Sequence, residues 1–102
     1  MNDGFLSFKS MMLAVSMEKI KVGRVFKYFA KPMVAAIQIE EGTLRVGDTI
    51  AIQGHTTDIT QTVDSMEIDR NPIQEANPGQ SVGIKVADRV RPNDFVYKVI
   101  ED

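Results

Sequence analysis

The chain contains no cysteine and no tryptophan, and its only histidine is His55. The absence of cysteine excludes disulfide bonds and thiol chemistry, and it leaves His55 as the one nitrogen or sulfur ligand that a zinc site could use. No apolar run approaches the ~18 residues that a membrane-spanning helix needs. The net charge of −2 excludes a strongly basic nucleic-acid coat, although a local basic patch is compatible with it.

What is present is the composition of a small globular domain. The 102 residues are 43% hydrophobic and 25% charged, which leaves room for one domain. A domain of this size buries only about 60–65% of its unfolded surface, so closing a sheet into a barrel and removing its edges is a favourable route to stability. We expect a monomeric, cytoplasmic protein with no cofactor and no membrane contact.

The segment GTLRVGDTIAIQG, residues 42–54, is one residue away from a phosphate-binding loop. Asp48 stands where such a loop carries a lysine, and its charge would repel phosphate. The alternating, β-branched residues that follow predict a strand, whereas a phosphate site needs a helix N-terminus. We therefore expect a β-turn at Gly47 and Asp48, followed by a strand, and no nucleotide binding.

Hydrophobic residues recur with a period of two almost throughout residues 17–102, which predicts about six strands. The alternating positions are Ile20, Val22, Phe26 and Tyr28, then Met33, Ala35, Ile37 and Ile39, then Ile50 and Ile52, then Val82, Ile84 and Val86, and finally Phe95, Tyr97 and Val99. In the fourth strand the phase changes from Ile59 and Val63 to Met66 and Ile68, which predicts a β-bulge near residues 64–65. Bulges bend strands at barrel corners, so the pattern favours an all-β barrel.

Three segments carry a family resemblance. Residues 42–54, residues 63–71 (VDSMEIDRN) and residues 75–84 (EANPGQSVGI) resemble, in order and spacing, the second domain of elongation factor Tu and related translation factors. The resemblance implies a small closed six- or seven-stranded Greek-key β-barrel over residues 17–102, with structural turns at Gly47, Asp48, Gly79 and Gly83. The segment GHTTDITQTVDSMEI, residues 54–68, is similar to the corresponding segment of short, free-standing elongation-factor-like proteins of prokaryotes.

The resemblance also implies contact residues. In elongation factor Tu the second domain helps to hold the aminoacylated 3′ end of tRNA, and the glutamate and arginine of that site match Glu67 and Arg70. Ser81 stands in place of an asparagine that lines the aminoacyl pocket, and Asp69 stands in place of an aromatic residue or histidine. The pocket in those factors is completed by a GTPase domain that has no counterpart among these residues.

A basic cluster opens the predicted barrel. It consists of Lys19, Lys21, Arg24, Lys27 and Lys31, with no acidic residue among them. In a regular strand Lys19, Lys21 and Lys27 share one face, and Arg24 lies on the other. Such a stripe can follow a phosphate backbone, and it is also what a solvated outer barrel face requires.

The residues before the barrel form a separate segment. Residues 1–16 include an apolar set that fits neither a regular helix nor a strand, and Met17 is a natural start for the barrel. We expect a flexible N-terminal extension; a helix that packs on the barrel or on a partner is the alternative.

No constellation in the sequence predicts catalysis. Glu67 and Asp69 are two residues apart and could form an acid/base pair, but a solvated outer face is the simpler interpretation. We therefore expect a protein without enzymatic activity, a binding module that contacts RNA, the ribosome or a translation-related protein. The predicted contacts are Lys19, Lys21, Lys27, Glu67, Arg70 and Ser81. The alternative is an accessory barrel of an enzyme complex, because similar barrels are appended to the U32 family of peptidases.

Overall fold

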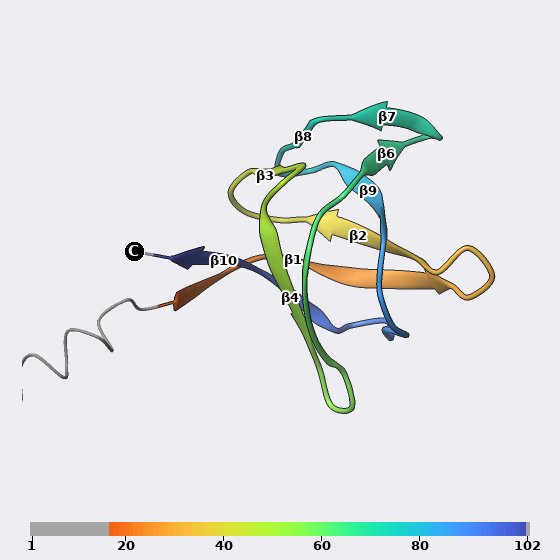
Figure 1. Cartoon of the computed structure of the whole chain (residues 1–102). Coiled ribbons are helices and arrows are strands. Elements are labelled where there is room, and N and C mark those ends of the chain that lie inside the picture. The colour runs from red at the N-terminus through yellow and green to blue at the C-terminus, as the bar shows by residue number, and fades with distance from the viewer. Residues whose placement is uncertain (1–16, 102) are drawn as a thin grey trace, which may run out of the picture.

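The computed structural model describes residues 17–101, and all of the regular structure in this range is β-strand (Figure 1). The strands are β1 (Met17–Phe29), β2 (Val34–Ile39), β3 (Leu44–Arg45), β4 (Thr49–Gln53), β5 (Asp58–Thr62), β6 (Met66–Ile68), β7 (Asn71–Ile73), β8 (Glu75–Ala76), β9 (Ser81–Lys85) and β10 (Phe95–Glu101). The predicted all-β fold class is thus confirmed. The expectations about residues 1–16 lie outside the described residues.

Eight strands form one antiparallel sheet in the order β5-β4-β10-β1-β2-β9-β6-β7, and β3 pairs with β8 in a short separate ladder. The long strand β1 lies at the centre of this order, between β2 and β10. The first and last described strands therefore lie side by side, and the curved sheet wraps around one core (Figure 1).

The Gln61 side chain bridges the gap between β5 and the end of β9. The Gln61 amide donates a hydrogen bond to the Lys85 carbonyl oxygen at 2.9 Å, and its oxygen accepts one from the Ala87 backbone N–H at 2.7 Å. Gln61 lies in β5, for which the only strand ladder among the described residues is with β4. The amide group reproduces the donor–acceptor pair of a backbone peptide, so it closes the barrel where no ladder does.

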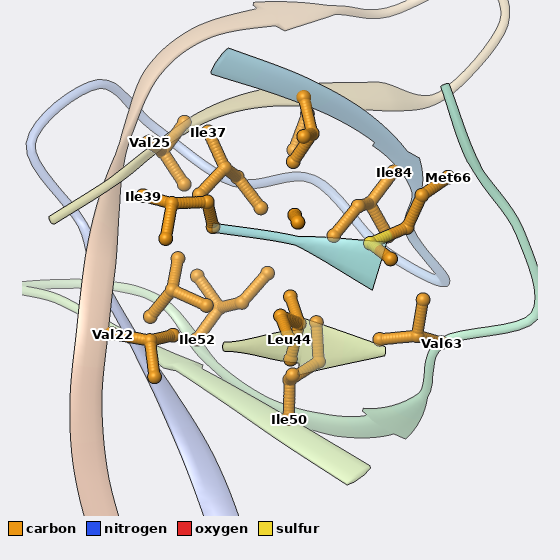
Figure 2. Close-up of a cluster of buried hydrophobic side chains, with 14 of the residues drawn as sticks. Val22, Val25, Ile37, Ile39, Leu44, Ile50, Ile52, Val63, Met66 and Ile84 are labelled. Atoms are coloured by element: carbon orange, nitrogen blue, oxygen red, sulfur yellow. The ribbon is translucent and has the colours of Figure 1, made fainter. Parts of the chain in front are cut away.

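The core is aliphatic. Side chains from strands on all sides of the barrel converge in its interior (Figure 2). The largest fully buried ones are Ile37, Ile39, Leu44, Ile50, Ile52 and Ile84, with several valines. The predicted inward positions of β2, β4 and β9 therefore face the core, and the phenylalanines Phe26, Phe29 and Phe95 stay substantially exposed.

The predicted alternation of the first strand holds at Val22, which is buried, and at Tyr28, which packs against the core, but it is wrong at Ile20 and Phe26. Ile20 and Phe26 are 46% and 50% exposed, whereas Val22 and Val25 are buried. Register shifts occur between Lys21 and Gly23 against β10, and between Val25 and Lys27 against β2. Each inserted residue reverses the side-chain alternation: after the first bulge Val25 faces the core and Phe26 faces solvent, and after the second the earlier phase returns at Tyr28.

Two further expectations about phase are corrected. The change of phase around residues 64–65 is a break between strands, because β5 ends at Thr62 and β6 begins at Met66 with new partners, β7 and β9. In β10 the inward residue is Val96, whereas Phe95 is 40% exposed and meets Tyr97 edge-on at 6.4 Å between ring centroids. Both sets of alternate positions in β10 are partly apolar, so alternation alone does not identify the buried one.

Candidate functional site

A tight turn between β6 and β7 presents two charged side chains. Asp69 and Arg70 adopt φ angles of 52° and 67°, and the residues on either side of them, Ile68 and Asn71, are paired across the hairpin. Two consecutive residues with positive φ are typical of a type I′ hairpin turn. This conformation favours glycine, asparagine or aspartate, so an arginine there is held in place by the surrounding structure.

The turn stands at the rim of a surface cavity of about 500 Å³. One wall is apolar and comes from the β1–β2 hairpin, with Phe26, Phe29 and Val34. The other wall is polar and comes from β6, the turn and β9; its side chains are Glu67, Asp69, Arg70 and Ser81. The structure thus brings together the three contact residues Glu67, Arg70 and Ser81, and it places them opposite two exposed phenylalanines.

A second cavity of about 340 Å³ adjoins the first. Both are lined by Pro32, Val34, Glu67 and Gly83, so they form one continuous depression, called here the β9 groove. Gly83 lies inside β9 and not in the predicted turn, and it forms part of the floor: a Cβ atom there would lie 3.3 Å from Val34 Cγ1 and 3.4 Å from Glu67 Cγ. A larger residue at this position would narrow the groove between its two cavities.

The charged groups of the β9 groove are not ion-paired within residues 17–101. Glu67, Asp69 and Arg70 line the larger cavity, Lys85 lines the smaller one, and none of them takes part in the salt bridges of this part of the chain. Ser81 is engaged, because its hydroxyl donates a 2.7 Å hydrogen bond to the Gln38 side-chain oxygen. The groove therefore offers two carboxylates and two cations to a ligand.

The basic cluster is not the predicted stripe. Lys21 and Arg24 both reach the carboxylate of Glu40, at 3.5 and 3.0 Å, so they lie on the same side of the strand. The prediction that Arg24 lies on the opposite face is wrong because the bulge at Val22 shifts the alternation. The hydrogen bond from Arg24, aided by the charges of Arg24 and Lys21, lowers the pKa of Glu40.

The lysines of β1 face different surroundings. The Lys21 ammonium lies 4.6 Å from the centre of the Phe95 ring, and the Lys27 ammonium lies 5.0 Å from the centre of the Phe29 ring. Lys19 is exposed and lies opposite Val99 of β10. Lys27 therefore stands beside the wall of the β9 groove, while Lys21 is held by Glu40 and Phe95 farther along the strand.

The turn at Gly47 and Asp48 has a structural role. Gly47 adopts a φ of 99°, and the Asp48 N–H donates to the Arg45 carbonyl oxygen at 3.0 Å. The Asp48 carboxylate accepts from the Arg45 N–H at 2.8 Å and pairs with Lys98 at 3.3 Å. The Asp48 carboxylate therefore stabilises the turn that leads into β4.

Gly79, with a φ of 93°, occupies a second turn, in which the Gln80 N–H donates a hydrogen bond to the Asn77 carbonyl oxygen.

The possible metal ligands of the described residues are scattered. They contain no group of three histidine, cysteine, aspartate or glutamate side chains that could hold a metal ion, and His55 is exposed in the loop between β4 and β5. The same range contains no helix of the length and apolarity that a bilayer crossing requires.

The sheet order, the Gly47 turn and the clustering of Glu67, Arg70 and Ser81 define a β-barrel of the translation-factor domain 2 class. Residues 33–91 match the family model described as elongation factor Tu domain 2, and the chain belongs to this family. The predicted resemblance is therefore confirmed.

Similar proteins carry the barrel in two settings. The chain is 40% identical over 82 residues to a collagenase of Porphyromonas gingivalis (79% of this chain, 20% of that protein). It is 39% identical over 84 residues to an uncharacterized protease of Methanocaldococcus jannaschii (81% and 20%). It is 32% identical over 68 residues to elongation factor 1-alpha of Archaeoglobus fulgidus (67% and 16%). The chain spans about a fifth of the length of these relatives, or less.

A solved structure shows the same fold. The C-terminal domain of a putative U32 peptidase from Geobacillus thermoleovorans superimposes with a TM-score of 0.71 at 24% identity, covering 78% of this chain and 91% of that one. This domain therefore shares its architecture with the present barrel over nearly its whole length.

Proposed function

We propose that this barrel is a non-catalytic accessory domain that binds the partner or substrate of a peptidase-type catalytic unit. The observation that carries the proposal is the similarity at 39–40% identity to a collagenase and to an uncharacterized protease, each matched over about a fifth of its length. The rest of each relative lies outside the match and has room for the catalytic machinery. The solved C-terminal domain of a putative U32 peptidase supports the same context.

A binding role, as opposed to a catalytic one, is supported by the nature of the site. Glu67 and Asp69 lie at the exposed rim of a cavity whose opposite wall is formed by hydrophobic side chains. Such a combination of an apolar wall and a few polar groups is typical of a recognition surface. The purified chain alone is expected to hydrolyse no gelatin, and hydrolysis that copurifies with it through two columns would contradict this part of the proposal.

Affinity capture of the tagged full chain from its own cells tests the proposed context. Capture is carried out with and without ribonuclease, and bound proteins are quantified by mass spectrometry. We expect a peptidase-type protein to be enriched equally in both samples. Ribosomal proteins that are enriched without ribonuclease and lost with it would contradict the proposal.

A second candidate function, contact with RNA or the ribosome in translation, is favoured by one specific observation. The chain resembles elongation factor 1-alpha of Archaeoglobus fulgidus over two thirds of its length, and Glu67, Arg70 and Ser81 share one cavity. If Lys19, Lys21 and Lys27 each contact one phosphate, RNA binding should weaken with salt at a logarithmic slope of about −0.7 per contact. Replacing the three lysines by glutamine should then flatten the slope by roughly two units.

A further inference from the structure

The β9 groove consists of two adjoining cavities, so it can receive more than a single small group. Its two cavities, of about 500 and 340 Å³, meet over Gly83, where Val34 and Glu67 approach the glycine from either side. The groove runs from Phe26 and Phe29 at one end to Met66 and Lys85 at the other. An extended segment can therefore place successive side chains in the two cavities while its backbone crosses the floor at Gly83.

The Phe26–Phe29 end supplies an apolar anchor site. The two residues are 50% and 43% exposed, and both belong to the wall of the larger cavity. The β1 bulge between Lys21 and Gly23 shifts the alternation so that Val25 faces the core and Phe26 faces outward, and the exposure therefore follows from the backbone. Exposed aromatic side chains beside a cavity are typical of the anchor points of protein interfaces.

The charges of the groove distinguish between two classes of ligand. Among the residues that line the groove, Glu67 and Asp69 balance Arg70 and Lys85, and Lys27 beside the Phe29 ring adds a single positive charge, which is little with which to attract a polyanion. A phosphate backbone also offers only acceptors and negative charge to the two carboxylates. The backbone N–H groups of a polypeptide can donate hydrogen bonds to the two carboxylates. Its carbonyl oxygens can accept hydrogen bonds from Arg70 and Lys85. The groove thus complements a polypeptide better than it complements RNA.

We propose that the β9 groove binds an extended polypeptide segment that places one aromatic or large aliphatic side chain against Phe26 and Phe29. Glu67 accepts a hydrogen bond from a backbone N–H of this segment, and Arg70 donates one to a backbone carbonyl oxygen. The inference rests on the proposed accessory function, and it adds to that function the class of ligand and the surface that holds it.

The test is an NMR titration of the isotope-labelled full chain with two synthetic peptides. Each peptide has ten residues, which are glycine, serine or asparagine except at one position near the middle; that position is phenylalanine in one peptide and serine in its twin. We expect the first peptide to shift the backbone amide resonances of β9, the β6–β7 hairpin and the end of β1. The serine twin should bind at least about tenfold more weakly, because it has no large apolar side chain to bury against Phe26 and Phe29.

Two exposed phenylalanines provide a matched pair of variants. Phe29→Ser should weaken binding of the first peptide about tenfold, because its ring lines the larger cavity. Phe95→Ser removes an equally exposed ring that lines neither cavity, and binding should be unchanged. Equal weakening in both variants, or shifts confined to the opposite face of the barrel, would overturn the assignment of the groove.

A ten-nucleotide oligouridine added to the same labelled protein separates the two proposals. If neither peptide shifts any resonance at millimolar concentration, the groove proposal is overturned. The accessory function is tested separately, by the capture experiment. Shifts of the groove resonances by oligouridine alone overturn both, because the surface would then be a nucleic-acid site.

Discussion

The Glu40 carboxylate forms ion pairs with two basic residues, Lys21 and Arg24, that flank a β-bulge in β1. It accepts from Arg24 at 3.0 Å and pairs with Lys21 at 3.5 Å, which lowers the pKa of Glu40 below its usual value of 4.5. Because the folded-state pKa is the lower one, the stabilisation is complete above the unfolded-state value and disappears as the pH falls through the folded-state value. The ion pairs are partly solvent-exposed, so screening reduces their contribution.

The Glu40→Gln variant tests this linkage. We expect it to melt at a lower temperature than the wild type at pH 7, with the difference shrinking below pH 4.5 as the wild-type carboxylate becomes protonated. Thermal melts of both proteins over a series of pH values measure the effect. Glu41→Gln removes a neighbouring charge that forms no salt bridge in the described part of the chain. An identical pH dependence in that variant would show that net charge, and not the pairing, is responsible.

Gly47 owes its importance to backbone conformation. Its φ of 99° is unfavourable for residues with a Cβ atom, although a Cβ there would meet nothing within 4 Å. We expect Gly47→Ala to lose about 1–2 kcal/mol of unfolding free energy through backbone strain alone. Chemical denaturation measures the loss, with the exposed Thr60→Ala in β5 as a control that should stay within about 0.5 kcal/mol of the wild type. A Gly47→Ala variant as stable as the control would refute the explanation.

Single residues differ in how well the sequence reveals them. Gly47 was predictable because turn chemistry and the strand that follows are local signals. Gly23 was not, because its constraint comes from a neighbouring strand: a Cβ there would collide with the Gln38 backbone carbonyl oxygen. A glycine inside a strand pattern is nevertheless a signal for a bulge, and it could have suggested the corrected phase of β1.

At the scale of the elements, bulges and breaks decide which residues form the candidate site. The alternation of β2 and β9 predicted their buried faces correctly, because the two strands pair with each other without a register shift. In β1 two register shifts reverse the alternation, and one of them exposes Phe26. The sequence gives little indication of these shifts, since an apolar residue such as Phe26 fits the alternating pattern whether its side chain is buried or exposed.

The Gln61 bridge makes a prediction about the barrel seam. Gln61→Ala removes the hydrogen bonds to Lys85 at the end of β9 and to Ala87 beyond it, so we expect a loss of about 1–3 kcal/mol in unfolding free energy. Gln53→Ala is the matched control, because that amide donates only to the exposed Asp58 carboxylate and should cost less than about 0.5 kcal/mol. Equal effects in denaturant titrations would mean that the seam is closed by backbone packing alone.

At the scale of the whole molecule, the resemblance predicted the family and brought Glu67, Arg70 and Ser81 into one set. The opposite wall of the groove was not predictable from motifs, because Phe26 and Phe29 belong to a hairpin some forty residues away in the sequence. The barrel brings this hairpin and the β6–β7 turn together through their common neighbour β9, whose Gly83 lies between them. The candidate site is therefore a property of the closed fold.

The salt dependence of binding tests the central claim, that this barrel recognises polypeptide and not RNA, most directly. Fluorescence anisotropy is measured with the labelled phenylalanine peptide and with a labelled ten-nucleotide oligouridine, from about 50 to about 200 mM salt. Because the groove carries balanced charges, we expect the Kd for the peptide to change by less than about twofold and the oligouridine to remain unbound. Oligouridine binding that weakens by more than about tenfold over this range, with no peptide binding, would contradict the account.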